Sequence, residues 1–238
     1  MRRALLLLVV ALSTLPACGR PGEAGPMISS QDLLEREGCA SLEVRIDMPG
    51  GQLNVSPGQE YLVDARFKFD KEAMRPLLES ERDGDRVLVT VSAPGYEDGI
   101  GRTFNEWDLR LLDACPIDLA LSMRIGRAEL NLAGVKARSL DLNLGGGELI
   151  LDLGEGSPLV GLTGNVEVGH GKALLKLPAG AGIRVRAWKS VGSLVVTGLS
   201  PDPEVEDAWV NPSFGRSEVI IDLTVRVGMG DLEVIARE

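Results

Sequence analysis

The chain of 238 residues carries 35 acidic and 25 basic side chains and one histidine, which gives a formal net charge of −10. An acidic surface repels the phosphates of nucleic acids, so we expect no nucleic-acid partner. A single histidine, His170, excludes metal sites that need several imidazole ligands, and any Ser–His nucleophile pair would have to use it.

Residues 1–17 are typical of an export signal. Arg2 and Arg3 precede a short apolar run over 4–12, which is too short to cross a bilayer of ~30 Å as a helix. Ala17 directly precedes Cys18, as in the signals of bacterial lipoproteins, which this segment resembles. The resemblance implies a lipid on Cys18 and an exported body anchored to the cell membrane or the outer membrane. Ordinary secretion, with Cys18 as a spare thiol, is the alternative.

Residues 18–37 are predicted to be a flexible tether, because positions 19–30 are rich in Gly, Pro and Ser. A helical turn or two over 31–37 is compatible with the pattern. An N-terminal β section follows over 38–113, where apolar and polar residues alternate from Leu42 onward. Within it, Asp83 and Gly84 predict a hairpin turn rather than a helix over 71–82.

Cys39 and Cys115 bracket the N-terminal β section. In an exported protein two cysteines are about as apt to be paired as to be free thiols, and the sequence leaves both possibilities open. A disulfide here would close a long loop and stabilise the fold by about 4 kcal/mol on the chain-entropy account.

Residues 114–238 are predicted to be a glycine-cornered β-repeat section. The pattern apolar-x-apolar-Gly-x-Gly-x-apolar-x-apolar occurs at 142–151, 166–175 and 225–234. Looser copies lie at 46–55, at 123–132 with Ala128 in place of the second glycine, and around Gly192. Aligning the second glycine of each copy gives corners at positions 51, 128, 147, 171, 192, 215 and 230. The spacing of roughly 21 residues from 128 to 215 predicts an all-β fold, a β-helix-like or β-solenoid stack onto which the N-terminal section packs.

Four segments resemble the bacterial toastrack domain, the extracytoplasmic β domain related to the C-terminal part of LiaF-type cell-wall-stress proteins. They are residues 105–111, 116–119, 139–148 and 209–215, and the resemblance extends over roughly 38–238. It implies a right-handed β-helix-like stack and a link to envelope stress. It offers no catalytic or ligand-binding residues to transfer to this chain.

The motifs favour structural over catalytic roles. No Gly-x-Gly corner opens a helix that could hold a phosphate, and none has the regular aspartates of calcium-binding repeats. His170 lies where other copies have Gly146 or Met229, which indicates an outward corner without function. We therefore expect no catalytic residues, no metal and no cofactor.

The scarce aromatic residues gather at insertions between repeats. Trp107, Trp209 and Phe214 could form a binding surface for a glycan or could cap the ends of the stack, and capping is the favoured interpretation.

The sequence as a whole predicts a non-catalytic, lipid-anchored envelope domain that binds or scaffolds an envelope protein or glycan. One alternative is a polysaccharide-cleaving enzyme with carboxylates such as Glu129, Glu148 and Asp231, because glycosidases need two acids ~5–10 Å apart. The other is a passive spacer or adhesin.

Overall fold

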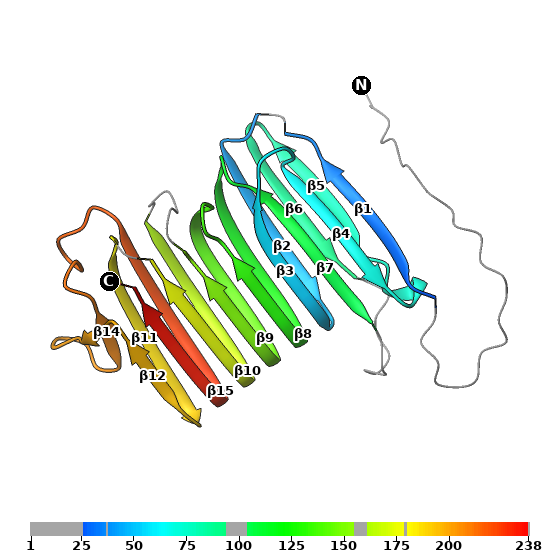
Figure 1. Cartoon of the computed structure of the whole chain (residues 1–238). Coiled ribbons are helices and arrows are strands. Elements are labelled where there is room, and N and C mark those ends of the chain that lie inside the picture. The colour runs from blue at the N-terminus through cyan, green and yellow to red at the C-terminus, as the bar shows by residue number, and fades with distance from the viewer. Residues whose placement is uncertain (1–25, 37, 94–103, 155–160, 179, 238) are drawn as a thin grey trace.

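The computed structural model describes residues 26–36, 38–93, 104–154, 161–178 and 180–237. Figure 1 shows one continuous stack of strands, with the N-terminal strands at one end and β12 and β14 at the other. In the part of the chain that is described, no helix is long and apolar enough to cross a membrane. Cys18 and the predicted signal over residues 1–17 lie outside the described residues.

The elements are almost all strands, with one short 3₁₀ turn, η1. Their bounds are β1 Ile28–Leu34, β2 Ser41–Met48, β3 Gly51–Gly58, β4 Val63–Phe69, η1 Glu72–Met74, β5 Leu77–Asp83, β6 Arg86–Ser92, β7 Asn105–Leu112, β8 Pro116–Asn131, β9 Lys136–Asp152, β10 Leu162–Leu177, β11 Gly182–Val191, β12 Leu194–Thr197, β13 Ser200–Pro201, β14 Ala208–Val210 and β15 Ile220–Ala236.

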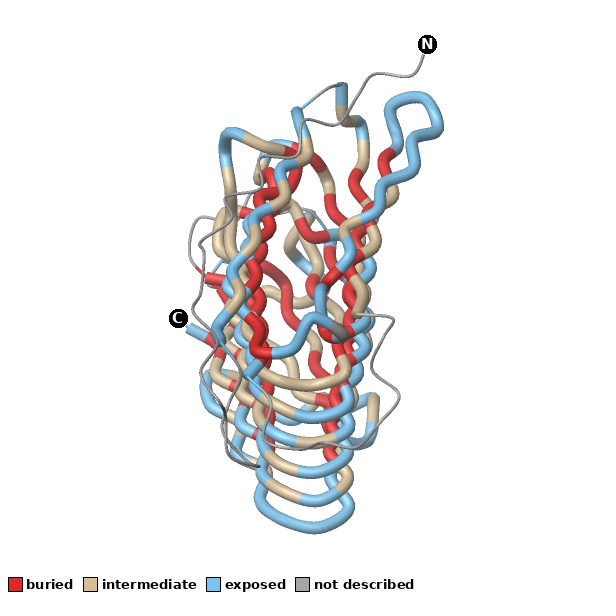
Figure 2. Tube along the Cα trace, turned by 90° about the vertical axis from the view of Figure 1, so that its right-hand side faces the viewer, coloured by how far each residue is buried: buried red, intermediate tan, exposed pale blue. Residues whose placement is uncertain are grey.

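Four long parallel strands, β8, β9, β10 and β15, form the centre of the stack. Each bends sharply near its middle, so its two halves belong to two walls that face each other across the core. β2 and β3 pair with the first and second halves of β8, and β11 and β12 pair with the corresponding halves of β15. Figure 2 shows the buried residues gathered between the walls and the exposed bends along one edge. The expected all-β, solenoid-like fold is thus confirmed.

Glycines make the bends possible. Gly51, Gly126, Gly147, Gly171, Gly230 and Gly192 follow one another along the stack, and all have positive φ. Gly147, for example, has φ +123°, and a Cβ there would lie 1.8 Å from the carbonyl oxygen of Gly126. Only glycine allows the neighbouring backbones to come this close.

Two of the predicted corners are wrong. Gly126, not Ala128, lies beside Gly147, because this copy has its glycine two residues earlier. Ala128 is fully buried and pairs with Leu149. Gly215 lies in a turn between β14 and β15, and no strand bends there.

The order of strands in the stack also departs from the order in the sequence. β15 lies between β10 and β11, so the last strand of the chain separates two strands that follow each other in the sequence. Its inward residues, among them Val225 and Leu232, are buried because strands cover both of its edges.

The tether predicted over 18–37 is too long. Ile28–Leu34 forms β1, which pairs antiparallel with β4 from Ile28↔Phe69 to Leu34↔Val63. The helical turn allowed over 31–37 is also wrong, since residues 31–34 belong to this strand. Backbone pairing with β4 overrides the weak local preference of the segment. The Asp83–Gly84 hairpin is confirmed, with β5 and β6 antiparallel on either side of Gly84.

The N-terminal section and the repeat section share one hydrophobic core. A single cluster extends from Leu42 in β2 to Ala236 in β15. Cys39 and Cys115 form a disulfide with Cα atoms 6.1 Å apart, which joins the segment before β2 to the segment before β8.

Candidate functional site

Trp107 cannot belong to a binding surface, which corrects that expectation. Its side chain is fully buried, its ring packs edge-on against Phe67 at 5.6 Å, and its Nε1 donates a hydrogen bond to Asn105 Oδ1 at 2.8 Å. Asn105 in turn donates to the carbonyl oxygen of Gly50 at 2.9 Å, so the pair fixes β7 beside the first corner. The sequence indicates this burial, because the alternation of residues 105–111 places Asn105 and Trp107 on the inward side with Leu109.

Trp209 and Phe214 lie at the opposite end of the stack. Trp209 on β14 pairs with the buried Val185 of β11 and packs against the edge of the core. Phe214 lies under the guanidinium of Arg184, whose Cζ is 5.0 Å from the ring centroid. Both rings are half-buried. The structure therefore places two of the three predicted aromatics at the same end of the stack. Trp209 packs as a cap against the core, and Phe214 lies against the outward side chain of Arg184.

Trp188 is a further aromatic at this end that the sequence interpretation did not place in the site. It points outward from β11, donates from Nε1 to Asp207 Oδ2 at 2.9 Å, and lies 5.5 Å from the guanidinium of Arg226. Trp188 follows Arg186 by two residues in an alternating strand, so the sequence pattern places both side chains on the outer face.

An arginine pair and a carboxylate connect the cap to the outer face. Arg184 forms an ion pair with Asp222 of β15, and Arg186 approaches the same carboxylate at 3.4 Å. Burial alone would raise the pKa of Asp222, but the hydrogen bonds and charges of the two arginines outweigh it and hold this pKa below its ordinary value.

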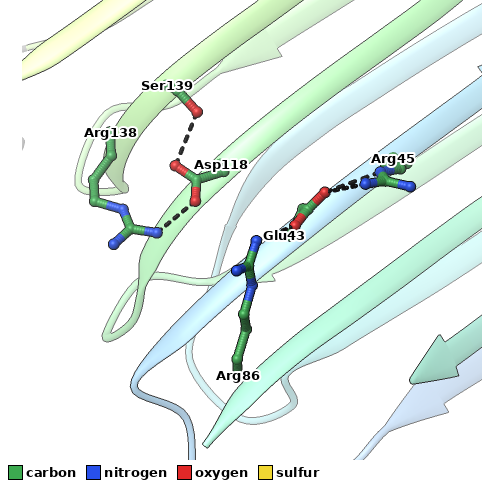
Figure 3. A network of polar contacts seen from close by, with 6 residues as sticks. All are labelled: Glu43, Arg45, Arg86, Asp118, Arg138 and Ser139. Carbon is green, nitrogen blue, oxygen red and sulfur yellow. Dashed lines mark hydrogen bonds and ion pairs between the residues drawn. The ribbon is translucent and has the colours of Figure 1, made fainter. Parts of the chain in front are cut away.

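The same outer wall holds other acids that are engaged in the same way (Figure 3). Glu43 on β2 is bound by Arg45 and Arg86, both at 2.6 Å. Asp118 lies opposite Glu43 on β8, pairs with Arg138 and accepts a hydrogen bond from the Ser139 hydroxyl at 2.8 Å. Hydrogen bonds from Arg86 and Arg45 lower the pKa of Glu43. A general acid needs a raised pKa, so this adjacent pair of carboxylates is poorly suited to glycoside cleavage.

The acids considered for an enzyme lie on the other wall. Glu148 pairs with Arg127, Glu129 lies 3.4 Å from Arg127, and Asp231 accepts a hydrogen bond from the Ser193 hydroxyl at 2.6 Å. Lys172 on β10 stands between Glu148 on β9 and Asp231 on β15. Alternating charges across the strands, rather than a pair of facing acids, describe this surface.

His170 lies at an exposed bend, in register with Gly146 and Met229. Among the described residues, no three His, Cys, Asp or Glu side chains gather as a metal would require.

Two grooves indent the outer faces. One borders Asp47, Met48, Arg124 and Asn143, beside Ala93. The other, of about 360 Å³, crosses β9, β10, β15 and β11 and is lined by Ser139, Leu140, Thr163, Gly164, Asn165, Arg186, Asp222 and Thr224. The second is defined wholly by strand residues, so its shape follows from the register of the stack.

A solved structure shares the fold over nearly the whole chain. A putative cell adhesion protein from Clostridium sporogenes is 22% identical, with a TM-score of 0.80 over 89% of this chain and 100% of that one. A putative adhesin from Bacteroides fragilis, 8% identical, is matched over 88% of this chain and 97% of its own, with a TM-score of 0.29. A putative lipid binding protein from Parabacteroides distasonis, 10% identical, is matched over 90% and 98%, with a TM-score of 0.32. No curated protein sequence matches the chain.

One family model matches the sequence. It describes the N-terminal domain of toast_rack, DUF2154, and matches residues 23–176. The match begins before β1 and extends through most of β10, which includes the disulfide and three of the glycine corners after Gly51. Because it covers more than half of the chain, the protein belongs to the toast_rack family.

Proposed function

We propose that this protein is a non-catalytic, lipid-anchored module of the cell envelope that binds or scaffolds another envelope component. The single observation that carries the binding proposal is that arginines pair with the acids on both walls. Glu43, Asp118, Asp222 and Glu148 are all held by arginines, and no two form a free facing pair. Such faces suit contact with a partner better than proton transfer.

The name of the Clostridium sporogenes protein, a putative cell adhesion protein, favours the same class of function over an enzyme. The resemblance to LiaF-type proteins also connects the proposal to envelope stress, where such a module would report on the component it binds.

The anchor in the proposal is a lipid on Cys18. Residues 18–27 separate this cysteine from β1, so the stack would sit close to the membrane surface. Mass spectrometry of the protein from a bacterial host tests the anchor. We expect an acylated N-terminus and recovery in membranes for the natural chain, and a soluble, unacylated product for Cys18→Ser. A Cys39→Ser/Cys115→Ser double variant serves as the control and should stay acylated; an unmodified Cys18 contradicts the anchor.

Binding is tested separately, with the Cys18→Ser variant and purified envelope fragments. Removing the lipid ensures that sedimentation with the fragments reports contacts of the folded body. We expect saturable co-sedimentation that excess unlabelled protein displaces. Co-sedimentation no greater than that of an unrelated acidic protein contradicts the binding proposal.

A further inference from the structure

The groove across β9, β10, β15 and β11 is built differently from the rest of the outer wall. Its positions in two adjacent rows hold short polar residues, Ser139 and Thr163 in one row and Asn165 and Thr224 in the next. Long side chains surround them, with Arg184 at one side and Glu167 and Arg226 one row further toward the bend. The hollow therefore results from short residues in register on β9, β10 and β15, next to Arg186 on β11. The groove has a volume of about 360 Å³ and is shallow and open, so a ligand would lie along it rather than be enclosed.

Three of the six polar side chains that line this groove make no hydrogen bond within the described part of the protein. Within the described residues, the side chains of Thr163, Asn165 and Thr224 have no hydrogen bond to another residue. Arg186 makes only a 3.4 Å contact with Asp222, and its Nε is buried without a partner. An unsatisfied buried donor costs about 1–3 kcal/mol, so a buried Nε without a partner is uncommon in folded proteins. Thr163 is exposed and Asn165 and Thr224 are half-buried, so their polar groups are open to a ligand.

The charge around the groove selects among ligands. Asp222 already accepts from Arg184 and Arg186, and Asp141 on β9 lies beside Asn165 on β10. An anion would meet these carboxylates, and a lipid chain would have to desolvate the polar lining. An uncharged ligand with many hydroxyls would match two hydroxyl groups, one amide and one guanidinium, each of which donates hydrogen bonds.

We propose that this groove binds an uncharged oligosaccharide through Thr163, Asn165, Thr224 and Arg186. The inference rests on the proposed function and names the chemistry of the component that the module binds. In this proposal the Asn165 carboxamide and the two threonine hydroxyls contact sugar hydroxyls, and the Arg186 guanidinium donates to a sugar oxygen. The flat wall leaves room for a chain to continue across neighbouring strands.

The test is an NMR titration of the ¹⁵N-labelled full-length protein in a polyoxyethylene detergent, which contains no sugar. Chitotetraose and maltotetraose are the two saccharide probes, and inorganic phosphate is the anionic probe. We expect at least one saccharide to shift the amides of β10 and β15 around Asn165 and Thr224. Phosphate should leave these amides unchanged.

Two variants and two matched controls locate the site. Asn165→Ala and Thr224→Val should each weaken binding about tenfold, which corresponds to about 1.4 kcal/mol. Asn54→Ala and Thr197→Val make the same changes on the outward face of the other wall and should leave affinity within about twofold. Melting temperatures of all four variants establish that each is folded.

Three outcomes overturn the inference: no shift of groove amides with either saccharide, equal weakening by the control variants, or stronger shifts with phosphate. These results leave the proposed function intact if Cys18→Ser still binds envelope fragments. Failure of that sedimentation assay, together with a saccharide titration that succeeds, would instead count against the proposed envelope partner and not against the groove.

Discussion

Two neighbouring glycines in one corner differ in what a methyl group would meet. A Cβ on Gly147 would lie 1.8 Å from the carbonyl oxygen of Gly126, whereas on Gly146 its nearest atom would be the His170 carbonyl oxygen at 3.7 Å. Gly147 also has φ +123°, a conformation that other residues rarely adopt. The role of the Gly-x-Gly motif is therefore close backbone packing, and it differs between positions of the motif.

We predict that Gly147→Ala lowers the free energy of unfolding by about 3 kcal/mol or more, because strain and a backbone clash add. Gly146→Ala should change it by less than about 0.5 kcal/mol. Urea denaturation of both variants measures the difference. Equal effects of the two substitutions would refute this account of the corner.

Trp107 links the N-terminal strands through its ring and its Nε1. Trp107→Phe removes the donor to Asn105 and leaves a cavity, so we predict a loss of about 2–4 kcal/mol in stability. Trp209→Phe, at the half-buried cap, should cost less than half as much. Chemical denaturation followed by circular dichroism measures both, and a larger loss for the cap variant would be inconsistent with the packing described.

At the scale of elements, the junction of β11 and β15 depends on the ionised form of Asp222. Its folded pKa is below its ordinary value, so the stability it contributes is complete above about pH 4 and is lost as pH falls through the folded pKa. We predict that Asp222→Asn costs about 1–2 kcal/mol at pH 7 and reduces the fall in stability at acid pH. Asp141→Asn, an exposed acid two strands away on β9, is the control. If Asp222→Asn loses as much stability at acid pH as the unsubstituted protein does, Asp222 is not the group responsible.

The Cys39–Cys115 disulfide links elements far apart in sequence, with a separation of 76 residues. Cys39→Ser/Cys115→Ser should lower stability by about 4 kcal/mol on the chain-entropy account, with β2 and β8 still paired in the native state. Thermal unfolding with and without reductant gives the comparison. If the unsubstituted protein unfolds at the same temperature with and without reductant, the disulfide contributes little to stability.

The sequence predicts the local parts of this fold better than their assembly. The corners at Gly147, Gly171 and Gly230 are read directly from the motif, since each needs the same backbone conformation. The copy at 123–132 has one glycine, so motif alignment placed its bend two residues late. The insertion of β15 between β10 and β11 depends on which edges are left open in three dimensions, which no local pattern encodes.

The candidate site was harder to predict than the fold. The sequence allowed Trp107 a place in a binding surface or in a cap at the end of the stack, whereas its alternation with Asn105 and Leu109 puts it inside the core. Among the groove residues, Thr163 and Asn165 lie on β10 and Thr224 lies on β15, and only the parallel register of the two strands brings them together.

At the scale of the whole molecule, the stack is a long, continuous core with two outer walls. Its walls carry arginine-held acids and a polar groove on the β9–β10–β15–β11 face, and Trp209 packs against the core at the end near β14. Paired strands hold this surface in place, which suits a module that presents fixed contacts rather than one that closes around a substrate.

The most direct test of the central claim, binding without catalysis, is to incubate purified cell-wall glycan with the Cys18→Ser protein and measure two quantities together. These are the protein retained on the glycan and the reducing ends released into solution. The account predicts saturable retention that Asn165→Ala weakens, with no release above a protein-free control. Release of reducing ends that disappears in Glu148→Gln would contradict it and identify an enzyme.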